Sequence, residues 1–567
     1  MDQDLRSIQQ AREMVRLAKA AQKRYRSFTQ DQVDAVVEAM VEAGAQAAER
    51  LGKMAREETG FGRPESKTQK NLFATRTLHE RMQGMRTVGI INKIEDGSVW
   101  EVATPMGVIG ALIPSTNPTS TAMYKAIIAA KAGCGIVMSP HPRAVTCTAE
   151  ALKVVAEAAY GAGAPRDLFA CMTDVTLDGT NALLEHPETD VILATGGSAM
   201  VREAYSKGKP AYGVGSGNVP VYVDRSSDID KAAADILYGT SFDWGTLCST
   251  ERSVVADAPI IRRLVEAMKR EGAYFMGEDE KEKLRRVIMR DGRFNTEQVG
   301  QSPVVIARTA GFRVPESTRA LVGEVDVVGK EEPLSMETLS PILSFYVEDG
   351  WQAGCERCIE VLEFGGIGHT LAIHCTSPNV VEAFALLKPS MRIVVNSVAA
   401  LGSVGYTNRL FPAMTLGPGT LGGSIISDNV SPMHLLNVKR VAFETNPIHP
   451  TTLTSSPAIG GRRTPDGRTD QTKSTYARGN RRQKGQTRSW MDEIDARLRA
   501  RAGNAPSASE RSALPTKTNS AAAKAEPRET AKPGIPTKSA EQIDQRPANK
   551  KGLSETDIDM IIRRFRR

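Results

Sequence analysis

Between Val99 and about Leu410, the sequence alternates short β-branched segments with longer amphipathic ones. Gly and Pro bound the β-branched segments, and the others place apolar residues at helical spacing. Strands that alternate with helices in this way form βαβ units around a mainly parallel sheet. The expected strands include GIVMSP, DVILATGG, SPILSFYVED, HTLAIHC and RIVVN, and the expected helices include STNPTSTAMYKAIIAAKAG, ALKVVAEAAYGAG, SAMVREAYSKG and IIRRLVEAMKREG. The sequence therefore predicts an α/β fold.

A chain of 567 residues is too long for one hydrophobic core and predicts two or three domains. Helical apolar spacing covers residues 1 to about 85, ahead of the alternating region. We expect a first domain over residues 1–225, a second over 226–410, and a Gly-rich return segment over 411–445.

The composition changes after Phe443, where Pro, Ser, Thr, Gly, Ala, Lys and Arg dominate up to about residue 550. Such a segment cannot bury enough apolar surface to offset its conformational entropy, so we expect 446–550 to be a disordered linker. With 25 basic and 13 acidic side chains, residues 446–567 carry a net charge of +12. The total is +7, so the rest of the chain carries −5 and is mildly acidic.

Two short helices are expected in this tail, at 490–503 and 551–567. In the second, Ile558, Ile561, Ile562 and Phe565 form one apolar stripe. A helix of about 14 residues is marginal alone in water, so the stripe favours docking into a partner's groove. The basic charge also raises nucleic-acid binding as an alternative, but almost no aromatic side chains are available for base stacking.

Composition argues against several other classes of protein. The chain lacks a run of about 18 apolar residues, so we expect no membrane span, and MDQDLRSIQQ does not read as a secretory signal. Seven scattered cysteines fit a reducing cytosol better than a disulfide framework. Cys355 and Cys358 form a C-x-x-C, but their surroundings read as a helix, and we expect no metal site.

Cys248 lies in SFDWGTLCSTER, a Gly-containing turn after a polar and aromatic loop. This setting suits an accessible nucleophile better than a packing residue, although a lone cysteine is more often buried. The remaining cysteines outside the C-x-x-C lie in apolar or helical runs or just after a strand, and we interpret them as structural: Cys134, Cys147, Cys171 and Cys375.

Several further motifs occur in a fixed order around Cys248: IPSTNPTST, VMSPHPRA, ILATGG, GVGSGNVP, GTLCSTER, ETLSP and GPGTLGGSIISDNVSPMHLLNVKR. Together they resemble the CoA-acylating branch of the aldehyde dehydrogenase superfamily, in particular propionaldehyde dehydrogenases of bacterial microcompartments. The resemblance extends from near the N-terminus to about Phe443. It implies a Rossmann-like cofactor domain, an α/β catalytic domain, and oligomerisation strands around Val99 to Val102 that make a homodimer or homotetramer.

The resemblance implies that Cys248 attacks the aldehyde and carries the acyl group as a thioester. It places Asn117 as the side-chain donor to the oxyanion, together with the backbone N–H of Cys248. The residues alone favour a different interpretation of Asn117, as a turn residue before Pro118, and the ordered motifs reverse that preference.

The resemblance also implies an NAD site. VILATGG followed by SAMVREAY predicts a strand, a Gly pair and a helix start, which suits a pyrophosphate, although G-x-G-x-x-G is absent. Hydrolytic relatives usually carry a lysine at Ser139, and this departure weakens the inference of cofactor preference. NAD is nevertheless expected rather than NADP. The cofactor-binding residues expected are Ile113, Ser139, His141, Arg143, Thr195, Gly196, Gly197, Val214, Gly215 and Glu337.

Hydrolytic aldehyde dehydrogenases carry a glutamate just before the Gly-rich turn, where it activates water. Here the turn reads YGVGSGNVP, and Gly213 or Val214 takes that position. A thiol is far more ionised than water near neutral pH, so coenzyme A needs less help as the acceptor. A hydrolysing enzyme that releases the free acid stays the alternative, and a catalytically silent shell scaffold is a second.

Two histidines stay open. His369 fits either a channel lining or a satisfied core position, and His434 receives no chemical role. The expected reaction is oxidation of propionaldehyde or acetaldehyde with NAD and coenzyme A. The last helix resembles an encapsulation peptide, so the expected partner is a shell protein and the expected location is cytoplasmic, within a bacterial microcompartment, without nucleic-acid or membrane binding.

Overall fold

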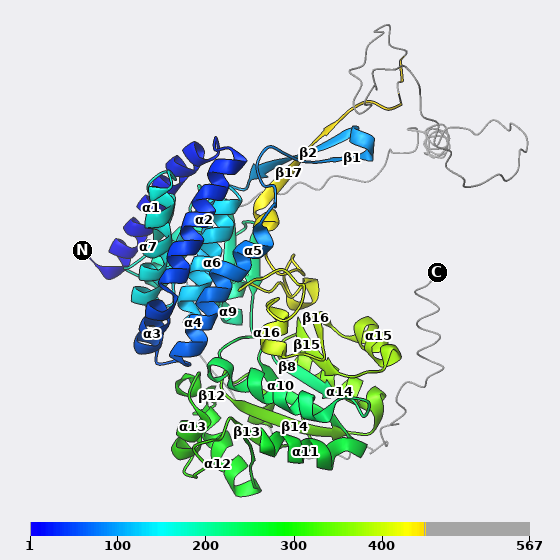
Figure 1. The fold of residues 1–567 in the computed structure, drawn as a ribbon. Helices are drawn as coiled ribbons and strands as arrows, with labels where there is room; N and C mark the ends of the chain where they lie inside the picture. Colours follow the sequence, from blue (N-terminus) through cyan, green and yellow to red (C-terminus); the bar gives the residue numbers. More distant parts are fainter. Residues whose placement is uncertain (1, 447, 450–567) are drawn as a thin grey trace, which may run out of the picture. The chain divides into compact units, whose positions relative to one another are not determined.

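The computed structural model describes residues 2–446 and 448–449. These residues form three principal sheets and the helices around them (Figure 1). No helix among the described residues combines the length and the apolar character needed to cross a membrane.

The first parallel sheet has five strands in the order β5-β4-β3-β6-β7. Between strands that are consecutive in the chain, the connection contains a helix, as in βαβ units. The strands are β3 (Val108–Ile113), β4 (Gly135–Pro140), β5 (Phe169–Cys171), β6 (Val191–Thr195) and β7 (Ala211–Val214). The chain leaves β3 toward β4 on one side and reaches β6 on the other, so the strand order reverses between β3 and β6.

Helices bury both faces of this sheet. Alternate residues of each strand point to opposite sides, so each strand contributes to the core on both faces. In β3, Ile109 and Ala111 belong to one hydrophobic cluster, whereas Val108 and Leu112 belong to another. The first cluster includes residues of α2 (Gln30–Gln46), α6 (Pro118–Lys131) and α7 (Val145–Gly161). The second includes residues of α1 (Gln3–Tyr25), α8 (Leu177–Glu185) and α9 (Ser198–Ser206).

The N-terminal helices cover this sheet and extend toward the second one. After α1 and α2, they continue as α3 (Ala48–Thr59), α4 (Pro64–Leu72), the π-helix η1 (Phe73–Thr77) and α5 (Leu78–Met82). Thr29 caps α2 in a capping box with Gln32, as the sequence T-Q-D-Q suggests. Figure 1 shows α2, α6 and α7 side by side in blue and cyan, and these three helices contact one another.

The second parallel sheet has seven strands in the order β10-β13-β14-β9-β8-β15-β16. Its strands are β8 (Val219–Val223), β9 (Glu251–Asp257), β10 (Ala273–Phe275), β13 (Ala320–Glu324), β14 (Ile342–Glu348), β15 (Gly368–His374) and β16 (Ser390–Val395). Again two hydrophobic clusters share the strand residues between them: Val221 and Val254 lie in one, and Tyr222 and Val255 in the other.

Helices cover both faces of the seven-stranded sheet. They are α10 (Ile229–Ser241), α11 (Ile261–Arg270), α12 (Glu278–Ile288), α13 (Pro303–Thr309), α14 (Gly350–Phe364), α15 (Pro378–Leu387) and α16 (Ala399–Ser403). A small hairpin, β11 (Met289–Arg290) and β12 (Arg293–Phe294), turns at Asp291-Gly292, both with positive φ as a tight D-G turn requires. Short 3-10 turns complete the fold: η2 (Glu95–Gly97), η3 (Pro142–Ala144), η4 (Phe242–Gly245), η5 (Ala258–Ile260), η6 (Thr296–Gln298), η7 (Pro333–Ser335), η8 (Thr420–Gly422) and η9 (Pro432–Leu435).

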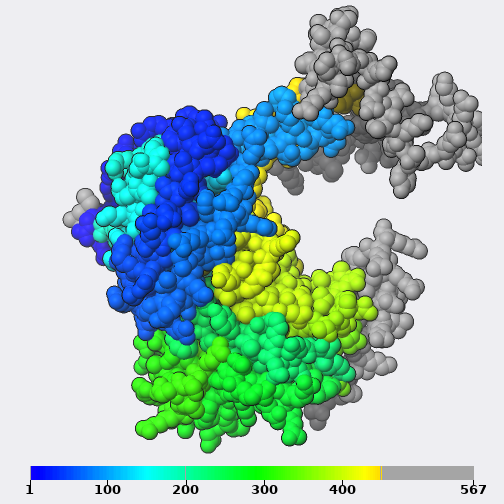
Figure 2. All heavy atoms as spheres, in the orientation of Figure 1, coloured from blue at the N-terminus to red at the C-terminus, as the bar shows by residue number. Residues whose placement is uncertain are grey.

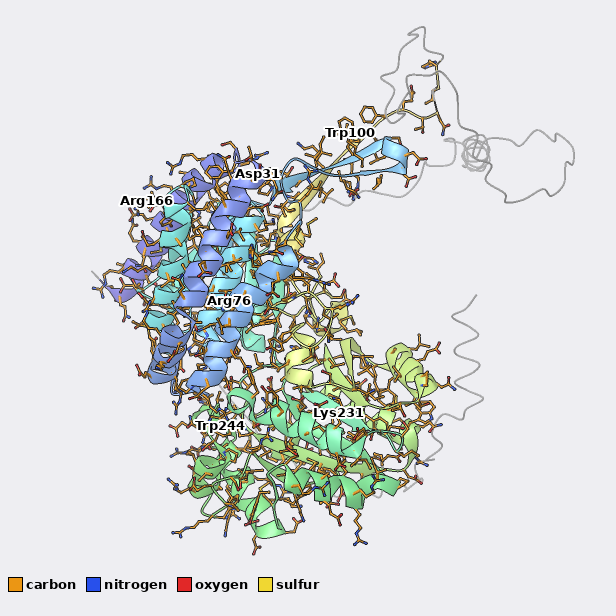
Figure 3. All side chains as sticks on the ribbon, viewed as in Figure 1. Asp31, Arg76, Trp100, Arg166, Lys231 and Trp244 are labelled. Carbon is orange, nitrogen blue, oxygen red and sulfur yellow. The ribbon has the colours of Figure 1, made fainter. Side chains whose placement is uncertain are left out.

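The third sheet is antiparallel, in the order β1 (Ile90–Ile94), β2 (Val99–Pro105) and β17 (Leu436–Ala442). It brings residues near the end of the described chain onto the N-terminal region, because β17 pairs with β2 along its whole length. The sheet extends away from the helices (Figures 1 and 2) and holds Trp100, labelled in Figure 3, against Phe443 with ring centroids 5.1 Å apart.

The predicted α/β architecture is confirmed, and every strand and helix quoted from the sequence forms at the expected place. Cys355 and Cys358 lie on α14, as expected, and both are buried. Apart from its first residues, the predicted linker lies outside the described residues, as do the helices predicted at 490–503 and 551–567.

Candidate active site

A cavity of about 420 Å³ opens at the point where the strand order of the five-stranded sheet reverses. β3 and β6 are neighbours, yet the helices that follow them, α6 and α9, cover opposite faces of the sheet. The carboxyl ends of the two strands therefore leave a crevice, which is where ligands bind in open α/β sheets. Pro114 to Asn117 follow β3. Thr195 is the last residue of β6, and Gly196 and Gly197 follow it. All of these residues line the cavity.

The loop after β6 offers an open backbone. A Cβ atom added to Gly196 or Gly197 would meet no atom within 4 Å. Gly197 is the N-cap residue of α9, so the unpaired N–H groups at the start of this helix lie beside the cavity. A group of the size and charge of a phosphate fits such a position.

Most of the residues predicted to bind the cofactor line this cavity. They are His141, Arg143, Thr195, Gly196, Gly197, Val214, Gly215 and Glu337. Two of the predicted residues do not. Ile113 is the last residue of β3, and its side chain packs in the hydrophobic core. The Ser139 hydroxyl is buried and forms a hydrogen bond with Thr180 Oγ1 at 2.8 Å.

The nucleophile candidate comes from the other sheet. Cys248 precedes β9 by three residues, at the amino end of that strand, and its side chain lines the cavity. Burial, followed by the negative charge of Glu337, raises the pKa of the Cys248 thiol to about 12. At neutral pH the free thiol is therefore protonated and needs a base to become the nucleophilic thiolate.

His369 lies directly beside this thiol. Its Nε2 is 3.2 Å from Cys248 Sγ, and its Nδ1 is 3.0 Å from Thr370 Oγ1. Burial, with a smaller contribution from Arg392, lowers the pKa of His369 to about 3, so its ring is neutral near pH 7. The sequence left the role of His369 open, and the structure brings it into contact with Cys248, 121 residues away in the chain.

The Gly-rich turn before β8 packs against the nucleophile. A Cβ atom on Gly217 would lie 2.2 Å from the backbone oxygen of Cys248 and 3.0 Å from the His369 ring. Any larger residue at this position would displace both groups. The backbone N–H of Gly217 also donates to Glu337 Oε1 at 3.0 Å, which links the turn to the loop before β14.

Asn117 occupies the N-cap position of α6 but its side chain does not cap the helix. Instead its Nδ2 donates to the backbone oxygen of Thr246 at 3.3 Å and to Thr116 Oγ1 at 3.1 Å. Its Oδ1 accepts a hydrogen bond from Lys70. Asn117 thus joins the first sheet to the loop that carries Cys248, and both residues line the same cavity.

Glu337 is the only acidic residue among the described residues that line this cavity. Burial raises its pKa to about 7, against the lowering effects of Arg252 and of the Gly217 N–H.

Gly213 is one of the two positions where a hydrolytic enzyme would carry its glutamate. A Cβ atom on Gly213 would lie 2.5 Å from Val201 and 2.8 Å from the Tyr205 ring. Packing against α9 therefore leaves no room for a glutamate at residue 213.

A smaller apolar cavity of about 20 Å³ adjoins the first and shares Leu247, Val404 and Met414 with it. The rest of its wall is mostly aromatic and aliphatic: Phe73, Phe242, Leu401 and Tyr406, together with Gln69 and Lys70. Its mainly apolar wall suits a short alkyl group, and it includes Leu247, the residue before Cys248.

The sequence model of the aldehyde dehydrogenase family matches residues 4–285 of this chain. The bifunctional aldehyde-alcohol dehydrogenase AdhE of Escherichia coli is 40% identical over 434 residues, which cover 76% of this chain and 49% of AdhE. The chain thus spans about half the length of AdhE. The acetylating succinate-semialdehyde dehydrogenase of Clostridium kluyveri is 34% identical over 76% of this chain and 95% of its own length.

Solved structures agree. An acetylating aldehyde dehydrogenase from Geobacillus thermoglucosidasius is 48% identical, with a TM-score of 0.78, over 79% of this chain and all of that one. Two propionaldehyde dehydrogenases are 28% identical, each with a TM-score of 0.69 over 76% of this chain. One comes from a Clostridium phytofermentans fucose-utilisation microcompartment and is covered to 96%. The other, from Rhodopseudomonas palustris, holds CoA and an acylated cysteine and is covered to 97%.

The chain therefore belongs to the aldehyde dehydrogenase family, within its CoA-acylating branch. The resemblance read from the ordered motifs is confirmed at this level.

Proposed function

We propose that this protein oxidises a short aldehyde with NAD⁺ and transfers the acyl group to coenzyme A, giving acyl-CoA and NADH. The observation that carries the proposal is the contact of His369 with Cys248, which itself lines a cavity that has no carboxylate at residue 213 or 214. A nucleophilic thiol with a neutral base beside it suits thioester formation and acyl transfer. The missing carboxylate disfavours water as the acceptor.

In the first half of the reaction, His369 takes the thiol proton and the Cys248 sulfur attacks the aldehyde carbon. This requires the tautomer in which Nδ1–H donates to Thr370 Oγ1 and the Nε2 lone pair faces the sulfur. The aldehyde oxygen then becomes negative. Asn117 Nδ2 and the backbone N–H of Cys248 donate to this oxyanion, and removing one such donor typically costs about 100- to 1,000-fold in rate.

The crevice between β3 and β6 fits a dinucleotide. Thr195, Gly196 and Gly197 with the start of α9 would hold its pyrophosphate, and Glu337 would accept hydrogen bonds from the nicotinamide ribose. His141 and Arg143 would lie at the adenosine end. The bound nicotinamide supplies the hydride acceptor that turns the adduct on Cys248 into a thioester.

In the second half, the CoA thiol enters beside the acylated Cys248. His369, which has released its first proton to solvent, takes the proton of the CoA thiol, and the CoA sulfur attacks the thioester carbonyl. The Cys248 thiolate leaves as acyl-CoA forms, and His369 returns the proton to it, so the net reaction releases one proton.

The proposed function is tested by mixing the protein with NAD⁺ and propionaldehyde, with and without CoA. We expect sustained NADH formation only when CoA is present. Equal turnover without CoA would support hydrolysis to the free acid instead, and no NADH in either mixture would support a scaffold with an inert Cys248.

The role of His369 is tested by His369→Gln, with His374→Gln as the matched control. Both histidines lie on β15 and are buried, at 1% and 2% exposure, but His369 contacts Cys248 whereas His374 is the last residue of the strand, five residues further on. We expect His369→Gln to lower kcat by about 100-fold or more, the usual loss for a general base. His374→Gln should retain kcat within about twofold; an equal loss in the two variants would contradict the proposal.

We propose propionaldehyde or acetaldehyde as the substrate because the pocket beside Cys248 is small and apolar. One methylene in such a pocket is worth about 1–3 kcal/mol, so kcat/KM should depend steeply on aldehyde chain length. The measurement is kcat/KM for a series of linear aldehydes. An optimum at a long chain or at succinate semialdehyde would contradict this choice.

We further propose that the protein works inside a bacterial microcompartment and that the predicted helix at 551–567 docks into a shell protein. Its apolar stripe supports this, as does the likeness to an enzyme from such a compartment. Removing residues 551–567 should leave kcat unchanged and abolish co-sedimentation with shells. Ile562→Asp, which charges the stripe alone, should act in the same way; loading that survives the deletion would refute this docking role.

A further inference from the structure

Two buried lysines and a buried aspartate lie close to Cys248, and one of them, Lys70, also forms part of the wall of the smaller cavity. The side chains of Lys67, Lys70 and Asp243 are exposed by 2%, 4% and 0%. Lys67 Nζ is 3.2 Å from Asp243 Oδ2, and Lys70 Nζ also bonds to this oxygen. Isolated charges at this depth are costly, so the cluster persists only because its members pair with one another.

Asp243 is also held in an unfavourable backbone conformation. Asp243 and Trp244 have φ values of 48° and 50°, which are uncommon for residues other than glycine. Two further hydrogen bonds hold the Asp243 carboxylate in place. The backbone N–H of Arg63 donates to Oδ1 at 2.6 Å, and Thr246 Oγ1 donates to Oδ2 at 2.6 Å. Trp244 lies where this turn meets the N-terminal helices, with the Arg63 guanidinium 5.1 Å from its ring (Figure 3). Strain retained in this way is typical of functional sites.

The cluster reaches the proposed oxyanion donor through one atom. Lys70 Nζ donates to Asn117 Oδ1 at 2.5 Å while it also bonds Asp243. Because an ammonium group only donates, it fixes which end of the Asn117 amide is the oxygen. The NH₂ end must then face Thr246 and the cavity side of the loop. A cation on the carbonyl oxygen also polarises the amide and strengthens its N–H groups as donors.

We propose that Lys70, held in place by Asp243, is a positioning residue that orients and polarises Asn117 for oxyanion stabilisation. This inference rests on the proposed role of Asn117. Lys67 differs from Lys70 in its second contact, because it donates to the backbone oxygen of Thr116 at 3.1 Å and makes no contact with the amide. Thus Lys70 links the charged cluster to the amide, and Lys67 ties the cluster to the loop backbone.

Electrostatics supports this geometry. Burial lowers the pKa of Lys70 to about 8, and the nearby Asp243 carboxylate opposes this shift. Burial alone would raise the pKa of Asp243, but the ammonium groups of Lys67 and Lys70 bring it below its usual value. At neutral pH Lys70 therefore carries its proton beside an ionised Asp243, as the polarising role requires.

The test uses an ester because attack of Cys248 on an ester also passes through an oxyanion and needs neither NAD⁺ nor CoA. With p-nitrophenyl propionate, the Cys248 sulfur bonds to the carbonyl carbon and p-nitrophenolate leaves, so the pre-steady-state burst reports acylation alone. The variants are Lys70→Met, Asn117→Ala and the double variant. Lys70→Gln, which keeps an N–H donor without the charge, serves as the second variant should Lys70→Met not fold.

We expect Lys70→Met to lower the burst rate constant by about 10- to 100-fold, the scale of a misplaced catalytic group. Asn117→Ala should lower it by about 100- to 1,000-fold. If Lys70 acts through Asn117, the double variant should match Asn117→Ala within about twofold, because the two effects are not additive. The Kd for NAD⁺ should stay within about twofold of wild type.

Lys131→Gln is the matched control. Lys131 is equally buried, with a side chain 4% exposed, and pairs with Asp34 away from the cavity. We expect a wild-type burst from it. A wild-type burst from Lys70→Met, or a double variant that loses the product of both single losses, would overturn the inference. Since the burst requires no CoA, a failure of the proposed acyl transfer would appear separately, in the NADH assay.

Discussion

At the scale of single residues, Glu337 couples the cavity to pH. Burial raises its pKa to about 7, so it is protonated below that pH and ionised above it. Only the ionised carboxylate accepts a hydrogen bond from each of two ribose hydroxyls. We therefore expect the Kd for NAD⁺ to fall as pH rises from 6 to 8.5, with the change centred near pH 7, as measured by isothermal titration.

Glu337→Gln supplies the control for this prediction because its amide does not titrate. The variant should bind NAD⁺ more weakly than wild type at pH 8.5, with little dependence on pH. Binding that weakens as pH rises in the wild type, or a wild-type pH profile in Glu337→Gln, would contradict the assignment of Glu337 to the nicotinamide ribose.

At the scale of elements, α14 is fitted to the seven-stranded sheet through a glycine. A Cβ atom on Gly354 would lie 2.3 Å from the ring of Tyr222 on β8. The ring cannot move aside easily because it is fully buried and stacks on Phe384 with centroids 5.0 Å apart. Alanine in a helix is ordinarily about 1 kcal/mol better than glycine. Here overpacking should reverse the sign, so we expect Gly354→Ala to lower the free energy of unfolding by about 1–3 kcal/mol.

The matched control is Gly161→Ala, at the last residue of α7. A Cβ atom there meets nothing within 4 Å, and its φ is not in the left-handed region. This variant should leave stability unchanged or raise it by up to about 1 kcal/mol. The measurement is urea unfolding followed by circular dichroism; equal stability in the two variants would show that the Tyr222 ring yields.

At the scale of the whole molecule, the three-stranded sheet has two open edges, β1 and β17. Its strands expose apolar side chains such as Ile90 and Val441, at 37% and 38%. Unpaired strand edges with apolar side chains tend to pair with another chain. We therefore expect a homodimer or homotetramer by light scattering after gel filtration, and a smaller assembly for the Ile90→Asp, Val441→Asp double variant.

Leu177→Asp controls for the added charge, since Leu177 is 62% exposed on α8, away from this sheet. It should assemble like wild type. A monomeric wild type, or unchanged assembly in the double variant, would refute a role of the sheet in assembly. The domain division at about residue 225 likewise stays a prediction, to be tested by limited proteolysis.

Strand and helix positions could be predicted because they depend on local patterns. The β-branched run of β3 and the helical spacing of α6 are encoded within a few residues of each element. Cys248 was identified as the nucleophile candidate from its own loop and from the ordered motifs around it. The sequence indicates Gly213 or Val214 as the position without the glutamate, but the close approach of Val201 to Gly213 depends on how α9 packs.

The sequence by itself determined the α/β class, the positions of the quoted strands and helices, and a candidate nucleophilic cysteine in a Gly-containing turn, because these properties follow from neighbouring residues. Only the tertiary structure decided which distant groups meet. Strand order in the seven-stranded sheet brings His369 to Cys248 across 121 residues, and the docking of α4 brings Lys70 to Asn117 across 47. Hydrogen-bonded contacts of this kind depend on the relative placement of whole elements, and no local spacing encodes that placement.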